Sequence, residues 1–153
     1  MSGTRVFEQL DQLRDAVGVP LGQSAWLLVD QDRVNAFADA TGDHQWIHVD
    51  PERAKDGPFG GTIGHGYLTL SLLPSASYEV VPRQGGSMSI NYGLNRVRFP
   101  SPVPVGSRVH ATFEVVDVDK QDWGAQVTMK ATIDREGGEK PVCVAEIVFR
   151  YYN

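Results

Sequence analysis

The chain has 153 residues, of which 41% are hydrophobic and 22% are charged, and its formal net charge is −5. This length fits one domain, and this composition is typical of a folded globular protein rather than a disordered one. The single cysteine, Cys143, excludes a disulfide scaffold. Because the chain is acidic and has no basic run, we expect it to bind neither nucleic acid nor an anionic membrane surface.

The sequence predicts neither a membrane span nor a signal peptide. Its longest apolar stretches are interrupted well short of the ~18 residues that a spanning helix needs. The first 15 residues carry five charges, whereas a signal peptide has an uncharged apolar centre. We therefore expect a cytoplasmic protein that forms one domain over residues 1–153.

The first part of the chain predicts a helix followed by a strand. Apolar residues at helical spacing predict a helix over residues 4–17, which Gly18 and Pro20 would end. Residues 1–20 would thus form an N-terminal helical extension. The apolar run 25–29 predicts a short strand.

Two further helices are predicted from their capping residues. Asp30, or Asp32 if the helix starts later, fits an N-cap, and Gly42 fits the residue that follows a helix end. The sequence Asp-Pro-Glu at 50–52 reads as an N-cap, a first-position proline and a first-turn acid. This third helix would end near 57–58.

The segment 67–81 predicts a helix that is buried in the core. It follows a flexible glycine pair at 60–61 and the sequence Gly-His-Gly at 64–66. Apolar residues fall on nearly every face of this helix, which is the pattern of a fully buried one. Pro74 is expected to kink it.

The second half of the chain predicts an antiparallel sheet. Four segments are rich in Val, Ile, Thr, Phe and Tyr and lie between short turn-like sequences: 87–99, 107–119, 124–135 and 141–152. Period-2 alternation joined by short turns is typical of an antiparallel meander. A very apolar helix followed by such a sheet predicts an α+β fold in which the curved sheet wraps the helix.

Asp43 and His48 are the first candidate catalytic residues. They lie five residues apart in the segment 43–49, which is predicted to be irregular and sits between two helices. A carboxylate beside an imidazole can bind a water molecule and move its proton near neutral pH. A turn-forming aspartate and a structural histidine would give the same pattern, so spacing leaves both readings open.

The sequence Gly-His-Gly at 64–66 is the second candidate. Glycine lets a ligand approach the backbone closely, and free N–H groups at a helix start favour negative charge. A thioester carbonyl that develops enolate character would suit such a site. The alternative is a tight turn at the start of the buried helix.

A metal site is weighed and not expected. Five possible ligands lie in this part of the chain: Asp43, His44, His48, Asp50 and His65. The four-residue spacing of the first two histidines would suit ligands on a helix. The glycine at 42 and the proline at 51 argue against a helix there, and Asp50 is better explained as an N-cap. No cofactor is expected either.

These residues resemble a known family. The stretch FADATGDHQWIHVDPERAKDGPFGGTIGHGYLTLSLLP, residues 37–74, is similar to the MaoC-like (R)-specific enoyl-CoA hydratase family. The later NYGLNRVRFPSPVPVGSRV, residues 91–109, resembles the same family, and the similarity covers about residues 21–152. The resemblance implies a hot-dog fold, in which a curved antiparallel sheet wraps a long helix, and a homodimer.

The resemblance also implies roles for individual residues. Asp43 and His48 match the catalytic pair that activates the water added to C3 of a trans-2-enoyl-CoA and protonates C2, giving a (3R)-3-hydroxyacyl-CoA. The backbone N–H of Gly66 matches the oxyanion donor, and His65 matches a motif histidine with a structural role. The implied partner is therefore a CoA thioester, and neither metal nor cofactor is needed.

Three positions depart from the family pattern. Gln45 and Trp46 replace an Asn-Pro pair, as in a subgroup that resembles nodulation protein N and certain actinobacterial hydratases. Gln45 keeps an amide that could support the site. Pro74 replaces a serine found in some members, so the hydrogen bond that supports the aspartate must come from elsewhere or be absent.

Two other functions remain open at this point. An acyl-CoA thioesterase could use the same fold and substrate class. A non-catalytic partner subunit of a heteromeric dehydratase is a further alternative, although such a chain would be free to lose Asp43 and His48.

Overall fold

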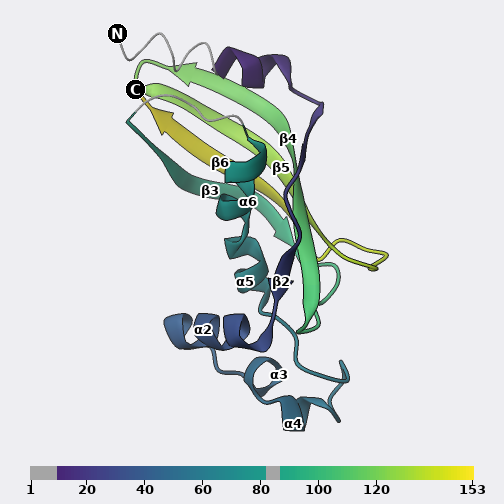
Figure 1. Cartoon of the computed structure of the whole chain (residues 1–153). Coiled ribbons are helices and arrows are strands. Elements are labelled where there is room, and N and C mark those ends of the chain that lie inside the picture. The colour runs from purple at the N-terminus through teal and green to yellow at the C-terminus, as the bar shows by residue number, and fades with distance from the viewer. Residues whose placement is uncertain (1–9, 82–86) are drawn as a thin grey trace.

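A six-stranded antiparallel sheet curves around the helices (Figure 1). The computed structural model describes residues 10–81 and 87–153. The strands are β1 (Pro20–Gln23), β2 (Leu27–Val29), β3 (Met88–Arg98), β4 (Ser107–Gln121), β5 (Gly124–Arg135) and β6 (Cys143–Tyr152). Their order is β1-β4-β5-β6-β3, and β2 also pairs with β4. The expected α+β hot-dog architecture is confirmed.

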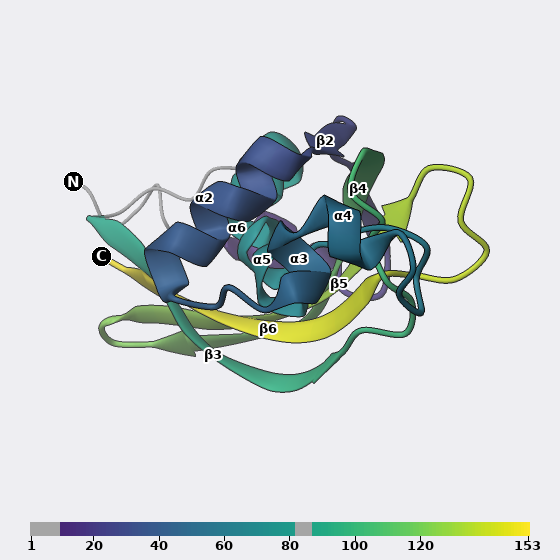
Figure 2. The same cartoon turned by 90° about the horizontal axis from the view of Figure 1, so that it is seen from below.

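Apart from the helical residues 10–15, the helices fall into two groups. They are α2 (Gln31–Thr41), α3 (Trp46–Val49), α4 (Pro51–Ala54), α5 (Gly66–Ser71) and α6 (Leu73–Val80). The consecutive helices α5 and α6 lie against the concave side of the sheet, and α2, α3 and α4 gather at one end, by the start of α5 (Figures 1 and 2). Within residues 10–81 and 87–153, no helix is long and apolar enough to cross a membrane.

The predicted caps are confirmed where the helices begin and end. Asp30 caps α2 by accepting a hydrogen bond from the backbone N–H of Arg33 at 2.9 Å. Gly42 ends α2 with a φ of 85°, and its N–H donates to the carbonyl of Ala38 at 2.8 Å. That left-handed backbone favours glycine, and it turns the chain toward the candidate residues. Asp50 caps α4 in the same way as Asp30 caps α2.

Three local predictions need correction. β1 is not predicted by the sequence, because Gly18 and Pro20 indicate only the end of the first helix. That helix, predicted over 4–17, is seen at residues 10–15, and residues 4–9 lie outside the described part. The segment 43–49 is not irregular throughout, because Trp46–Val49 form the single turn α3.

The helix predicted over 67–81 is broken and only half buried. It begins at Gly66 and divides at Leu72 into α5 and α6. The break follows from Pro74, which has no N–H to continue the helical hydrogen bonds. Tyr67 and Tyr78 are each 74% exposed, so the helix is not buried on every face. Its apolar residues therefore cover the sheet on one side and face outward on the other.

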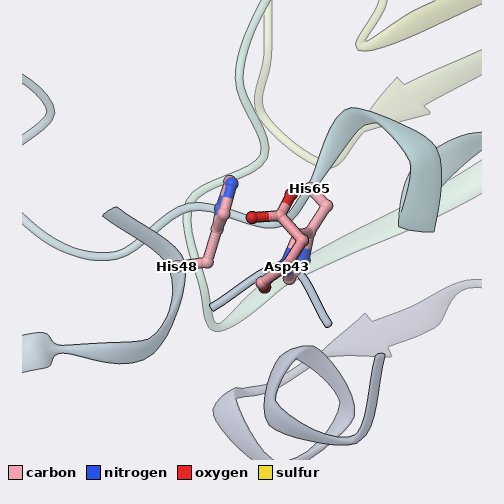
Figure 3. Close-up of side chains that lie close together, drawn as sticks. All are labelled: Asp43, His48 and His65. Carbon is pink, nitrogen blue, oxygen red and sulfur yellow. The ribbon is translucent and has the colours of Figure 1, made fainter. Parts of the chain in front are cut away.

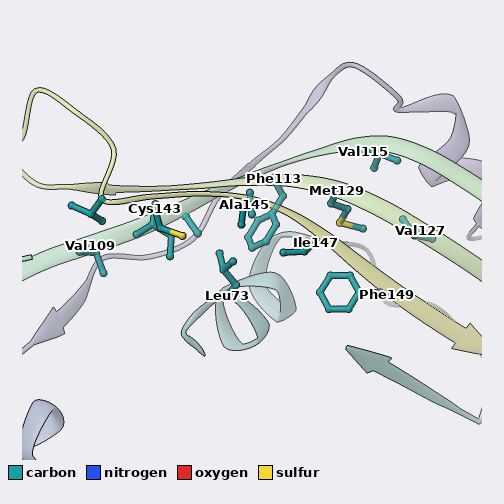
Figure 4. Packing of buried hydrophobic residues seen from close by; sticks show 14 of the residues in the cluster. Leu73, Val109, Phe113, Val115, Val127, Met129, Cys143, Ala145, Ile147 and Phe149 are labelled. Carbon is teal, nitrogen blue, oxygen red and sulfur yellow. The ribbon is translucent and has the colours of Figure 1, made fainter. Parts of the chain in front are cut away.

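The core lies between the helices and the inner faces of the three central strands (Figure 4). Phe113 on β4 is 1% exposed. It pairs with Ala131 on β5, which pairs in turn with Ala145 on β6, so the three residues form one row across the sheet. The large ring thus fills space that two alanines leave in one row across the sheet. Leu73 of α6 belongs to the same cluster.

We expect Phe113→Ala to lower the free energy of unfolding by about 3–5 kcal/mol, because the neighbouring alanines cannot fill the cavity. Urea denaturation followed by circular dichroism measures this change. Phe59→Ala is the matched control, because the Phe59 side chain is half exposed. A similar loss in both variants would contradict the packing described here.

Candidate active site

The candidate site forms where three segments meet at one end of the sheet (Figure 3). Asp43 lies in the loop after α2, His48 lies in α3, and His65 is the N-cap of α5. A carboxylate oxygen of Asp43 and one ring nitrogen from each histidine all lie within 4.8 Å of one another. The structure thus brings together three residues that span 22 positions in the sequence.

His48 is held as a neutral base. Its side chain is 7% exposed, and its Nδ1 lies 2.6 Å from the backbone carbonyl of Ile63. Because a carbonyl only accepts, Nδ1 carries the proton and Nε2 keeps its lone pair. Burial lowers the pKa of His48 below its usual value of 6.5; the hydrogen bond to Ile63 and the charge of Asp43 oppose this, and His65 adds to it. The imidazole is therefore ready to accept a proton at neutral pH.

His65 joins the other two residues. Its ring stacks on that of His48 with a centroid distance of 3.9 Å, and its Nε2 donates to the backbone carbonyl of Asp43 at 3.0 Å. The side chain is 2% exposed, and its Nδ1 has no hydrogen-bond partner among the described residues. His65 thus fixes the backbone of Asp43 and one face of the His48 ring.

Asp43 has an exposed carboxylate that points toward the ring of His48 (Figure 3). Its Oδ1 accepts a hydrogen bond from the backbone N–H of Gln45 at 3.3 Å. Pro74 cannot donate a hydrogen bond to the aspartate as a serine could, and here a local backbone N–H donates one instead. The support from Gln45 comes from its main chain, whereas the sequence suggests its side-chain amide.

Gly66 lies at the start of α5, where helix N–H groups have no carbonyl partner one turn earlier. A Cβ at Gly66 would lie 3.1 Å from the ring of Phe99, so a larger residue would displace that ring. Gly66 and Phe99 line a cavity of about 280 Å³ that also includes Ile63 and Thr69.

A second cavity of about 280 Å³ lies further along the helices. It is lined by Leu70 and Leu73 on the helix side, and by Leu94, Ile147 and Phe149 on the sheet side. Its walls are mainly apolar side chains. Both cavities thus border α5: the first lies by the segment that follows β3, and the second lies against β3 and β6.

His44 and Asp50, two of the five possible metal ligands, lie outside this cluster. His44 is exposed and pairs with Asp39 at 2.9 Å, which raises the pKa of His44. Asp50 serves as the N-cap of α4, as the sequence predicts. The remaining three are close enough for a metal, but the rings of His48 and His65 are stacked with only 25° between their planes. One nitrogen of each ring also lies at hydrogen-bond distance from a backbone carbonyl, Nδ1 of His48 from that of Ile63 and Nε2 of His65 from that of Asp43. The geometry fits proton transfer better.

The sequence does not indicate two residues that contact the site. The side chain of Gln31 donates to the backbone carbonyl of His48 at 2.7 Å and accepts from the hydroxyl of Thr62, also at 2.7 Å. Gln31 is the first residue of α2, a position that is ordinarily solvated. Its nearness to His48 arises only when α2 and α3 pack together.

Comparison with known proteins agrees with this architecture. The family model of the MaoC-like domain matches residues 12–137. The chain is 55% identical over 148 residues to 3-hydroxyacyl-thioester dehydratase Z of Mycobacterium tuberculosis, covering 96% of this chain and 98% of that protein. It is 46% identical over 141 residues to nodulation protein N of Rhizobium meliloti, covering 89% and 86% respectively.

Solved structures show the same fold. The (R)-hydratase from A. caviae involved in PHA biosynthesis has a TM-score of 0.73 and 29% identity, over 88% of this chain and 96% of that one. The R-hydratase PhaJ1 from Pseudomonas aeruginosa has a TM-score of 0.73 and 26% identity, over 90% and 82%. The present chain therefore belongs to the MaoC-like dehydratase family of hot-dog hydro-lyases.

Proposed function

We propose that this protein is an (R)-specific enoyl-CoA hydratase that reversibly adds water to a trans-2-enoyl-CoA, giving a (3R)-3-hydroxyacyl-CoA. The observation that carries the proposal is the hydrogen bond between Nδ1 of His48 and the carbonyl of Ile63, which leaves Nε2 free on a ring that lies in one cluster with the Asp43 carboxylate. The similarity to a 3-hydroxyacyl-thioester dehydratase and to (R)-hydratases supports the same reaction.

In this reaction Asp43 and His48 hold one water molecule between them. The Nε2 of His48 takes a proton as the water oxygen bonds to C3, and the π electrons move to the thioester oxygen. A proton from the same pair then reaches C2 and restores the carbonyl. One water is added overall, with hydroxyl at C3 and hydrogen at C2, so no redox group is required.

The backbone N–H of Gly66 would stabilise the enolate oxygen. Donors that point at developing negative charge in a site shielded from water commonly contribute about 10²-fold or more. The cavity at Gly66 would receive the thioester, and the apolar cavity lined by Leu94 and Phe149 would receive the acyl chain. His65 would support the ring of His48 by stacking on it and the backbone of Asp43 by a hydrogen bond.

We expect Asp43→Asn and His48→Gln each to lower turnover on crotonyl-CoA by at least about 10²-fold, because each removes one member of the acid–base pair. Loss of the ultraviolet absorbance of the conjugated thioester measures the rate. Chiral analysis of the product establishes its hand, and thiol detection reports any free CoA.

Asp39→Asn and His44→Gln are matched controls, since they remove the same functional groups from an exposed aspartate–histidine pair outside the cluster. Both should keep activity within about twofold of the wild type. Near-normal activity in Asp43→Asn or His48→Gln would refute the proposed roles. Release of free CoA by the wild type would instead indicate a thioesterase.

The lowered pKa of His48 predicts the pH dependence. Protonation removes the lone pair of the base, so kcat/KM should fall as the pH decreases through the pKa of His48. Since burial holds that pKa below 6.5, the midpoint of the acid limb should lie below pH 6.5. Proton NMR titration of the ring of His48 should give the same midpoint.

The signal of His44 provides the internal control, because Asp39 raises the pKa of His44 above 6.5. Asp39→Asn should lower the midpoint for His44 and leave the activity profile unchanged. A midpoint for His48 above 6.5 would show that burial does not determine its protonation.

We further propose that the protein is a homodimer that pairs through β3. This eleven-residue strand lies at the end of the sheet, and among residues 10–81 and 87–153 it pairs with β6 alone, which leaves its other edge without a strand partner there. Met88, Ile90, Tyr92 and Leu94 are exposed along it. A long apolar edge is a ready template for strand pairing. Antiparallel pairing of two copies of β3 would continue the sheet across the dimer.

Ile90→Lys should convert the dimer to a monomer, because pairing would bring the new charges of the two copies onto one edge. Size-exclusion chromatography with light scattering measures the mass. Val116→Lys, an exposed position on β4, is the control and should remain dimeric. A wild type with the mass of one chain would exclude the pairing.

A further inference from the structure

The side chain of Gln31 closes a ring of hydrogen bonds around His48. Its Nε2 donates to the main-chain carbonyl of His48 at 2.7 Å, and its Oε1 accepts from the Thr62 hydroxyl at 2.7 Å. Thr62 precedes Ile63, whose carbonyl binds Nδ1 of His48 at 2.6 Å. The backbone N–H of Ile63 also donates to the carbonyl of Ile47 at 3.0 Å.

We propose that Gln31 and Thr62 are positioning residues, which together hold the imidazole of His48 in its base tautomer and at its distance from Asp43. This inference rests on the proposed function of His48 and extends it to residues that do not touch the substrate. Gln31 holds the main chain of His48, and Thr62 holds the segment that contains the Ile63 carbonyl. The two anchors of the imidazole are thus fixed relative to each other.

The chemistry of the two side chains suits this task. A side-chain amide has both a donor and an acceptor. In Gln31 the NH₂ group donates to His48 and the oxygen accepts from Thr62. Glutamate would lose the donor to His48, and leucine would lose both bonds at nearly the same volume. Thr62 is 7% exposed, so its hydroxyl needs a partner within the protein.

Other contacts also stabilise α2. Asp30 caps the start of α2, Gly42 ends it, and Val34 and Ala38 bury its inner face. Loss of the amide should therefore leave the fold intact and free the imidazole. Misplacement of a catalytic group by ~1 Å can cost about 10²-fold in rate, so a small shift would be visible in kcat.

Two pairs of variants test the proposal in the full-length protein. Gln31→Leu and Thr62→Val remove the bonds, and we expect kcat on crotonyl-CoA to fall by about tenfold or more with KM little changed. Thr62→Ser keeps the hydroxyl and should restore kcat to within about threefold of the wild type. Asn35→Ala removes the other acceptor of the Gln31 amide, at 3.0 Å, and is the matched control.

Nitrogen-15 NMR of the His48 ring supplies a readout that does not depend on activity. The wild type and Asn35→Ala should show one tautomer with the proton on Nδ1. Gln31→Leu and Thr62→Val should show exchange between tautomers or a shifted pKa of His48. If Gln31→Leu does not fold, the comparison of Thr62→Val with Thr62→Ser still decides the question.

Unchanged kcat and an unchanged tautomer in Gln31→Leu and Thr62→Val, with only a lower Tm, would overturn the proposal and leave the contacts purely structural. Absence of hydratase activity in the wild type would refute the proposed function instead. In that case the NMR comparison would still show whether the two residues fix the ring of His48.

Discussion

The hydrogen bond from Nδ1 of His48 to the carbonyl of Ile63 is the interaction on which the rest of the site depends. It sets which ring nitrogen is free, and it ties α3 to the segment that leads into α5. The same contact allows the ring to be buried without an unpaired N–H, and burial in turn lowers the pKa of His48. One bond therefore determines the position, the tautomer and, indirectly, the protonation of the proposed base.

The surrounding fold makes this bond possible because both ends of the short segment 43–49 are fixed by the neighbouring helices. Gly42 ends α2 in a left-handed turn, and Asp50 caps α4, so the residues between them can take few paths. α5 packs against the sheet, and its N-cap, His65, contacts both Asp43 and His48. One end is thus held by the backbone of Gly42 and the other by the side-chain cap of Asp50.

Much of this arrangement could be predicted from the sequence, because caps and strand alternation are local signals. Asp30, Gly42 and Asp50 act as predicted, and the break near Pro74 follows from its missing N–H. The contacts that complete the site are not local. The bond from Gln31 to His48 joins residues 17 positions apart, and no pattern in α2 distinguishes it from a solvated glutamine. Likewise, α3 has only four residues, too few for a periodic signal.

The helix pair α5 and α6 is less buried in the single chain than its sequence pattern predicts. Apolar residues all around a helix predict full burial, yet Tyr67 and Tyr78 are exposed in the single chain. The apolar cavity lies between this helix pair and the strands β3 and β6, and the outer edge of β3 pairs with no other strand of the described part of the chain. Leu94 is exposed on that strand and also lines the cavity. Pairing at β3 would therefore add a second copy beside the proposed acyl-chain cavity, which couples the assembly of the protein to the shape of its substrate site.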